Sequence, residues 1–291
     1  MHLMKAPLAI VTMVYNEPEF LPLWRRHYAS QVGEKACYVI DHGTDDGSTD
    51  DLGGVNRLCI PRSPQDDETR SRAIACYCAA LLHWYDAMIY VDVDELLVAD
   101  PALYPSLIDF SRGWSAPVVT ATGLDVIHVP EHEPDIDWSV PVSRQRTHLR
   151  FTSSMCKPVL IRRPVDWAPG FHNTTKVPQL DAPLFLFHLR YADLMQGVKR
   201  LERTRRQPWI SEDAGRHQRM TNEDWSGMLR SMAALPDIRD ISLSADDPTL
   251  ALWRARVLSS SRSRMNDRYK IDLHISGDAL WKLPPRFAGT F

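Results

Sequence analysis

Long apolar segments and a large excess of one charge are both missing from this sequence of 291 residues. The apolar run over residues 8–14 is too short to be a membrane span or the core of a secretion signal. The formal net charge is −3, so the chain as a whole has no electrostatic attraction to nucleic acid. We therefore expect a cytoplasmic protein that has no nucleic-acid partner.

Cysteine is scarce as well, and its spacing excludes the usual frameworks. An odd number of cysteines without regular spacing argues against a secreted scaffold held by disulfides. Cys76 and Cys78 are separated by one residue, whereas zinc and redox pairs usually have two, and no second pair accompanies them. All five cysteines are therefore predicted to be reduced and structural: Cys37, Cys59, Cys76, Cys78 and Cys156.

The sequence also shows no internal repeat and no low-complexity linker. Its composition, 44% hydrophobic and 24% charged, is typical of an ordinary globular protein. The length is sufficient for one large domain or two small ones with a sizeable core.

The most informative stretch covers residues 87–97, where an apolar, β-branched run ends in Asp92, Asp94 and Glu95. The run predicts a buried strand. On a strand, Asp92 and Asp94 point to the same side, and two carboxylates held in this way repel each other unless a cation lies between them. A hard divalent ion that also binds phosphate oxygens fits such a place. The pattern thus predicts a metal–diphosphate site, although a solvated turn or a helix cap is the ordinary alternative.

Strands and helices alternate before this stretch. Residues 8–15 predict a strand, a helix follows from Pro18 to about Gly33, and residues 36–40 predict a second strand that ends at Asp41. A third strand at 55–60 and a helix at 70–85 complete this part. Such βαβ units form parallel sheets, so we expect an α/β fold with a doubly wound sheet. The carboxyl ends of its strands would place these polar side chains at one rim: Asn16, Glu17, Asp41, Asp92 and Asp94.

The second half of the chain gives weaker signals. We expect a short helix at 101–110, strands at 118–129 and 157–162, a strand pair formed by 170–174 and 184–189, and a basic helix at 193–206. Beyond residue 209 the pattern is mostly helical.

These motifs, taken together, resemble a known family. The sequence has Asn16-Glu17 after its first strand, an Asp-x-Gly loop with Gly-Ser-Thr-Asp over residues 41–50, and Asp-x-Asp-Glu-Leu over residues 92–96. Downstream are Lys157, Gly-x-His over 170–172 and His-Leu-Arg over 188–190. The set resembles the nucleotide-sugar-binding half of GT-A glycosyltransferases, in their family 2-like and family 92-like branch. The loop after Asp41 is longer than in that family, and Leu189 stands where the family has Tyr.

The resemblance covers residues 8–206 and implies a two-part chain. Residues 1–210 would form a GT-A domain with a Rossmann-like, mostly parallel sheet, and residues 211–291 a helical C-terminal extension. The implied reaction moves a sugar from a nucleotide-diphospho-sugar to a hydroxyl acceptor, with inversion, in surface polysaccharide or glycolipid synthesis. The acceptor would be a glycan or a lipid-linked molecule.

The resemblance also implies roles for individual residues. Asp92 and Asp94 would hold Mn²⁺ or Mg²⁺, with His188 as third ligand and His172 as its substitute. Asp41, Tyr15 and Glu17 would contact the nucleoside, whereas the diphosphate would meet Arg72, Lys157 and Arg190. The base that activates the acceptor would be Asp125, with His172, Glu131, Glu133 and Asp181 as further candidates. The ordinary alternatives are turn contacts for Asp41, structural roles for the histidines and surface ion pairs for the basic residues.

Two basic segments each allow two interpretations, and three other functions compete with glycosyl transfer. The helix at 199–206 and the arginines between Arg254 and Arg268 are either a solvated face or a contact with an anionic acceptor or the inner face of a membrane. A sugar-1-phosphate nucleotidyltransferase usually needs a Gly-rich loop after its first strand, where this chain has Asn16-Glu17-Pro18. A phosphatase of the haloacid-dehalogenase type needs its nucleophile on the first strand. A non-catalytic nucleotide-sugar-binding module is the third alternative.

Overall fold

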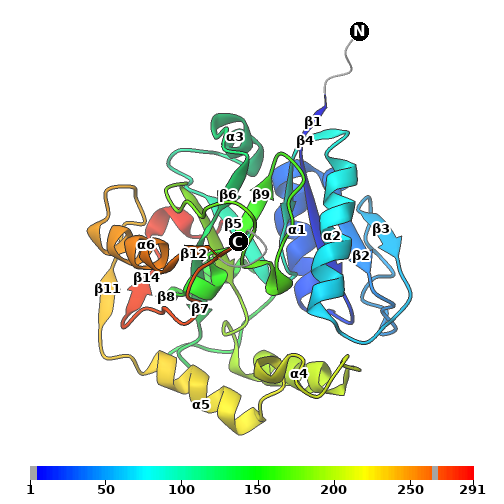
Figure 1. Ribbon diagram of the computed structural model, residues 1–291. Helices are drawn as coiled ribbons and strands as arrows, with labels where there is room; N and C mark the ends of the chain where they lie inside the picture. Colours follow the sequence, from blue (N-terminus) through cyan, green and yellow to red (C-terminus); the bar gives the residue numbers. More distant parts are fainter. Residues whose placement is uncertain (1–4, 264–267) are drawn as a thin grey trace.

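The computed structural model describes residues 5–263 and 268–291, and these contain two six-stranded sheets flanked by helices (Figure 1). The first sheet has the order β3-β2-β1-β4-β9-β6. Strands β1 to β4 run parallel, as the βαβ pattern predicts, whereas β9 and β6 are antiparallel to their neighbours. Its strands are β1 (Ala6–Val14), β2 (Cys37–Asp41), β3 (Asn56–Cys59), β4 (Tyr85–Tyr90), β9 (Pro158–Ile161) and β6 (Val118–Thr120).

Helices cover both faces of this sheet because side chains alternate along its strands. Ile10 of β1 packs in the core cluster that contains Trp24 of α1. Its neighbour Val11 faces the other way, into the cluster with Ile74 of α2. The helices are α1 (Phe20–Val32), α2 (Asp67–Leu81), α3 (Leu107–Gly113), α4 (Leu194–Arg206), α5 (Asn222–Ala233) and α6 (Pro248–Ser260).

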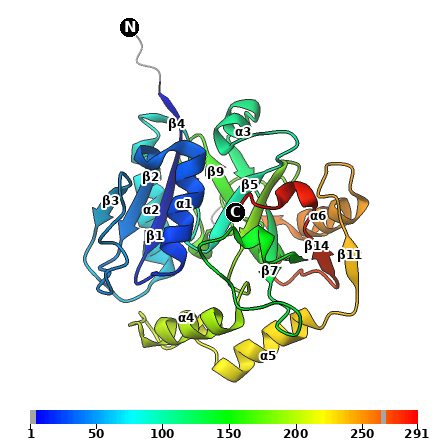
Figure 2. The ribbon, with the colours of Figure 1, turned by 180° about the vertical axis from the view of Figure 1, so that it is seen from behind.

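The second sheet has the order β11-β14-β8-β7-β10-β5. β10 is parallel to β7 and antiparallel to β5, so it lies between them. Figure 2 shows this sheet beside the first one, with α4 and α5 together at one end of the molecule. Its strands are β5 (Glu95–Ala99), β7 (Thr122–Ile127), β8 (His148–Phe151), β10 (Leu184–His188), β11 (Ile238–Asp240) and β14 (Leu280–Lys282).

Several short elements connect the larger ones. A two-stranded ribbon pairs β12 (Arg262–Ser263) with β13 (Tyr269–Lys270). The 3₁₀ helices are η1 (Glu34–Ala36), η2 (Val142–Arg144), η3 (Ser153–Met155), η4 (Pro169–Phe171), η5 (Arg216–Gln218) and η6 (Pro285–Phe287).

Three predicted elements differ from the structure. Residues 87–97 do not form one strand: β4 ends at Tyr90, a turn follows, and β5 begins at Glu95 in the other sheet. In the predicted pair of 170–174 with 184–189, the second segment is β10, but the first contains η4 and no strand. Residues 118–129 form two strands, β6 and β7, which belong to different sheets.

The C-terminal part is helical only in part. It contains α5 and α6, as predicted, but β14 and β11 join the second sheet beside β8. The ring of the last residue, Phe291, stacks on Phe187 of β10 with centroids 4.3 Å apart. Residues 211–291 therefore contribute to the core of the second sheet, and the boundary at residue 210 stays a prediction.

The cysteines and the helix lengths bear on two expectations from the composition. All five cysteines are free thiols; Cys37, Cys78 and Cys156 are buried, whereas Cys59 and Cys76 are exposed, so the structural role predicted for all five stays a prediction. Within residues 5–263 and 268–291, no helix combines the length and the apolar character that crossing a bilayer requires.

Candidate functional site

The predicted rim exists, because β1, β2 and β4 are parallel and end side by side. Asn16 follows β1 with a positive φ of 53°, a conformation that Asn tolerates better than most residues. Its side-chain N–H donates to the carboxylate of Asp45 (2.7 Å), and its side-chain oxygen accepts from the backbone N–H of Asp45 (3.0 Å). The motif after the first strand therefore fixes the loop that follows β2 against the end of β1.

Asp92 and Asp94 lie in the turn between β4 and β5. The backbone N–H of Glu95 donates to the carbonyl of Asp92 at 3.0 Å, which closes the turn. The hydroxyl of Tyr28 holds the start of β5, since it donates to the carbonyl of Glu95 and accepts from the N–H of Leu97. Because the backbone turns here, Asp92 and Asp94 take different partners instead of facing one cation together.

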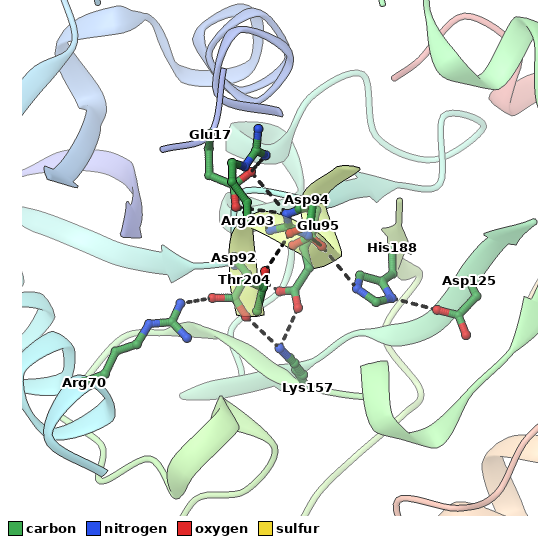
Figure 3. Close-up of polar contacts among 11 residues, drawn as sticks. Glu17, Arg70, Asp92, Asp94, Glu95, Asp125, Lys157, His188, Arg203 and Thr204 are labelled. Carbon is green, nitrogen blue, oxygen red and sulfur yellow. Dashed lines mark hydrogen bonds and ion pairs between the residues drawn. The ribbon is translucent and has the colours of Figure 1, made fainter. Parts of the chain in front are cut away.

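Asp92 is surrounded by cations (Figure 3). Its Oδ1 accepts from the guanidinium of Arg70 and from the hydroxyl of Tyr90 (2.9 Å), and its Oδ2 lies 3.2 Å from Nζ of Lys157. The same Nζ lies 2.5 Å from Glu95. Burial raises the pKa of Asp92, but Arg70 and Lys157 outweigh burial and hold the pKa below its ordinary value. Lys157 stays charged, because the two carboxylates raise its pKa against the effect of burial.

Asp94 belongs to a second group of contacts. Its Oδ2 lies 3.5 Å from Nε2 of His188, and Nδ1 of His188 donates to Asp125 at 2.7 Å (Figure 3). The register explains this geometry, since β10 pairs His188 with Asp125 of β7 on one side and with Glu95 of β5 on the other. Burial lowers the pKa of His188, but its hydrogen bonds to Asp125 and Asp94 prevail and raise the pKa to about 9.

Helix α4 brings Arg200 to the site, although the sequence motifs do not predict it there. The guanidinium of Arg200 contacts Asp94 and lies 2.8 Å from Glu17, and Arg203 contacts Glu17 and Glu19. Burial raises the pKa of Glu17, and its contact with Arg200 opposes this effect. Arg200 and Arg203 share a helix face because they are three residues apart. The basic segment 199–206 is the available signal, but the sequence leaves it as either a solvated face or a contact with an anionic partner.

The nucleoside side of the predicted site is built around Asp41. Its buried carboxylate binds Arg57 (2.6 Å) and the hydroxyl of Thr49 (2.9 Å), and accepts from the N–H of Thr44 (2.8 Å). Burial opposes charging, but these contacts lower the pKa of Asp41. Asp41 thus organises its own loop, which agrees with the alternative that it makes turn contacts. Tyr15 lies nearby at the end of β1, with the guanidinium of Arg62 3.7 Å from its ring centre.

Other predicted residues lie farther from these contacts or border them. Arg72, predicted to meet the diphosphate, is exposed on α2 and paired with Glu68 at 2.8 Å, whereas Arg70 contacts Asp92. His172 follows Phe171, whose ring packs on Tyr90 with centroids 4.2 Å apart. This segment therefore borders the Arg70–Asp92 pair. The guanidinium of Arg190 lies 5.8 Å from the ring centre of Tyr191.

The two basic segments, expected to be either a solvated face or a contact with an anionic acceptor or membrane, mostly contact their own chain. Lys199 pairs with Glu19 (2.7 Å) beside the contacts of Arg200 and Arg203. Arg254 donates to Thr122, and Arg268 pairs with Asp166 (2.6 Å). Arg264 lies outside the described residues. Contact with an anionic membrane stays a prediction.

The predicted metal ligands are only partly assembled. Within the described residues, no group of three or more His, Cys, Asp or Glu side chains is arranged to hold a metal ion. Asp94 and His188 face each other, as predicted, and their carboxylate oxygen and imidazole nitrogen suit Mn²⁺. Asp92 does not fit in the same way, because both of its oxygens are bound by protein donors.

Comparisons with known proteins give a distant structural likeness. No family model matches the sequence, and no curated protein matches it either. Among solved structures, the fold is similar to that of the mannosyltransferase PcManGT from Pyrobaculum calidifontis in complex with GDP-Man and Mn²⁺. The TM-score is 0.37 at 9% sequence identity, and the match covers 79% of this chain and 74% of that chain. At this TM-score the likeness does not establish a function.

Proposed function

We propose that this protein is a glycosyltransferase of the GT-A type, which moves a sugar from a nucleotide-diphospho-sugar to a hydroxyl acceptor with Mn²⁺ or Mg²⁺. The observation that carries the proposal is the Asp94–His188 pair at the rim of the parallel sheet, with Asp125 behind the imidazole. Divalent ions at phosphate sites need one or two protein ligands, because the phosphates and water supply the others. The pair is therefore sufficient when a diphosphate binds beside it.

Asp94 and His188 would hold the ion, and Asp125 would orient the imidazole. A carboxylate only accepts hydrogen bonds, so Asp125 keeps the proton of His188 on Nδ1 and leaves Nε2 directed at Asp94. Nε2 must be free of its proton to bind a metal, so binding would release one. When bound, the ion offsets the negative charge that develops on the departing diphosphate.

The cations around Asp92 would bind the diphosphate directly. Arg70 and Lys157 are held in place by Asp92 and Glu95, which keeps both charged groups oriented without a ligand. Arginine binds phosphate through two N–H groups, and lysine acts as a point charge. We retain Tyr15, Glu17 and the loop after Asp41 as the nucleoside side of the rim. Arg190 remains a candidate for the diphosphate.

The acceptor side is less specified. Inversion needs a base near the acceptor hydroxyl. Because Asp125 is bonded to His188, we assign it to positioning, and His172, which follows the Phe171 ring packed on Tyr90, is the proposed base. A glycan or lipid-linked acceptor, a role in surface polysaccharide or glycolipid synthesis, and a cytoplasmic location with peripheral membrane contact belong to the same proposal.

The test is a panel of nucleotide-sugars assayed for thermal stabilisation with and without Mn²⁺. We expect one donor to raise the melting temperature of the wild type when Mn²⁺ is present, because a ligand that binds the native state stabilises it. The isosteric variant Asp94→Asn should lose this shift. The control Asp240→Asn makes the same change at an exposed residue of β11 and should keep it. A shift that is independent of the divalent ion and of the nucleotide would contradict the proposal.

A further inference from the structure

The contact between Arg200 and Asp94 concerns the same oxygen that faces His188. Oδ2 of Asp94 accepts from the guanidinium of Arg200 and lies 3.5 Å from Nε2 of His188. A divalent ion bound between Asp94 and His188 would therefore compete with Arg200 for this atom. Asp94 is 5% exposed, so there is little room for both cations at its carboxylate.

Every acid of this region already has a protein cation beside it. Glu17 and Asp94 share Arg200, and Glu95 binds Lys157. The remaining pairs are Asp92 with Arg70 and Asp125 with His188. A divalent ion that entered alone, even with the release of one proton from His188, would add net positive charge to acids that already have cationic partners, which is unfavourable in a largely buried site. An ion that entered together with a diphosphate would bring the compensating negative charge.

Arg200 lies where its guanidinium can bind such a diphosphate. It projects from α4 and reaches Glu17 after β1 as well as Asp94 after β4, so its guanidinium lies between two of the strand ends that form the rim. Arg203 and Lys199 hold the same helix to Glu19, which anchors α4 when Arg200 changes partner. Its five N–H groups suit a diphosphate as well as they suit carboxylates.

We propose that Arg200 and the divalent cation compete for Asp94, and that the guanidinium released from Asp94 binds the diphosphate of the donor. Arg200 is thus a binding residue for the leaving group and the reason that the ion and the diphosphate bind together. This inference rests on the proposed function for its second half, whereas the competition for Asp94 can be measured with the metal alone.

The experiment uses isothermal titration calorimetry on the full chain with three probes: MnCl₂ alone, GDP or UDP with MnCl₂, and the corresponding nucleoside monophosphate with MnCl₂. We expect Arg200→Gln to bind Mn²⁺ alone about tenfold more tightly than the wild type, because the competing charge is gone. The same variant should bind the diphosphate about tenfold more weakly, with monophosphate binding changed much less. The control Arg206→Gln removes the same charge from an exposed position of α4 and should match the wild type.

The outcomes separate the two levels of the proposal. Equal Mn²⁺ affinity in the wild type and Arg200→Gln would overturn the competition, and an equal loss of diphosphate and monophosphate would overturn the contact with the leaving group. If the wild type binds no nucleotide, the proposed function fails, while the metal titration still reports on Arg200. Should Arg200→Gln not fold, Arg200→Lys is the second variant. Its single ammonium cannot hold Glu17 and Asp94 together as the guanidinium does, so it should compete less well for Asp94 and bind Mn²⁺ more tightly than the wild type. Unchanged affinity in Arg200→Lys would overturn the inference.

Discussion

Nδ1 of His188 donates a hydrogen bond of 2.7 Å to Asp125, its register partner on the neighbouring parallel strand. Both side chains are buried, so the imidazole has little freedom to turn. The bond directs Nε2 toward Asp94, and a partner of this kind typically contributes to metal affinity although it does not touch the metal. The position of Asp125 thus fixes the orientation of the His188 imidazole.

Replacing Asp125 with Asn tests this relationship. The change keeps the shape and removes the charge that fixes the proton on Nδ1. We expect the affinity for Mn²⁺ in the presence of GDP or UDP to fall by about 10- to 100-fold, measured by calorimetry. Asp240→Asn should leave the affinity unchanged. An Asp125→Asn variant that folds and retains wild-type affinity would show that His188 is not a ligand oriented by Asp125.

A second prediction concerns the buried cation Lys157. Lys157→Met leaves Asp92 and Glu95 without their shared partner, and an unpaired buried charge is costly. We expect the free energy of unfolding to fall by about 3–5 kcal/mol in urea denaturation. The control Lys282→Met removes a lysine whose side chain is 57% exposed. It should change the free energy of unfolding by less than about 1 kcal/mol. A small effect of Lys157→Met would mean that Arg70 alone neutralises the pair.

The rim could be predicted from the sequence because it depends on local patterns. Alternating strands and helices imply parallel strands, and parallel strands bring their carboxyl ends together. This reasoning placed Asp41 and Asp92 at one edge. It also placed His188 near Asp94, through the resemblance to a family with a histidine after a late strand.

The partners at the rim could not be predicted, because they depend on distant segments. The apolar residues on both sides of Asp92 and Asp94 give no local sign that β4 ends at Tyr90; the turn exists because β5 pairs with β10 in the other sheet. Arg70 and Arg72 differ by about half a helical turn, so choosing between them needs the orientation of α2. Arg200 is 106 residues from Asp94, and no local pattern links the two.

A third prediction concerns pH and a group outside the site, His27 of α1. Nε2 of its buried imidazole is 2.9 Å from the carbonyl of Leu97, and burial lowers its pKa from 6.5 to about 4. The unfolded chain therefore binds a proton between pH 6.5 and 4 that the folded chain does not bind, so stability is lost as the pH falls through this window. The loss attributable to His27 is about 3 kcal/mol.

The measurement compares urea denaturation of the wild type and His27→Gln between pH 7 and pH 4. As the pH falls, the wild type should lose more of its unfolding free energy than His27→Gln does, because glutamine does not titrate. A difference that stays constant over this range would show that His27 does not bind its proton preferentially in the unfolded state.

The fourth prediction tests the packing that positions α4. A Cβ at Gly197 would lie 2.0 Å from the ring of Trp225 on α5, which is closer than any real contact, and Trp225 is 1% exposed. Gly197→Ala should therefore push the two helices apart and lower the free energy of unfolding by about 1–3 kcal/mol. Because the same turn of α4 carries Arg200, we also expect weaker binding of GDP or UDP with Mn²⁺.

The matched control is Gly227→Ala on α5, where an added Cβ meets nothing within 4 Å. Alanine is favoured over glycine inside a helix, so this variant should gain about 0.5–1 kcal/mol. The same chemical change is thus expected to have opposite signs on two helices that pack together. If both variants stabilise the protein, Trp225 has room to move, and the position of α4 does not depend on its contact with Gly197.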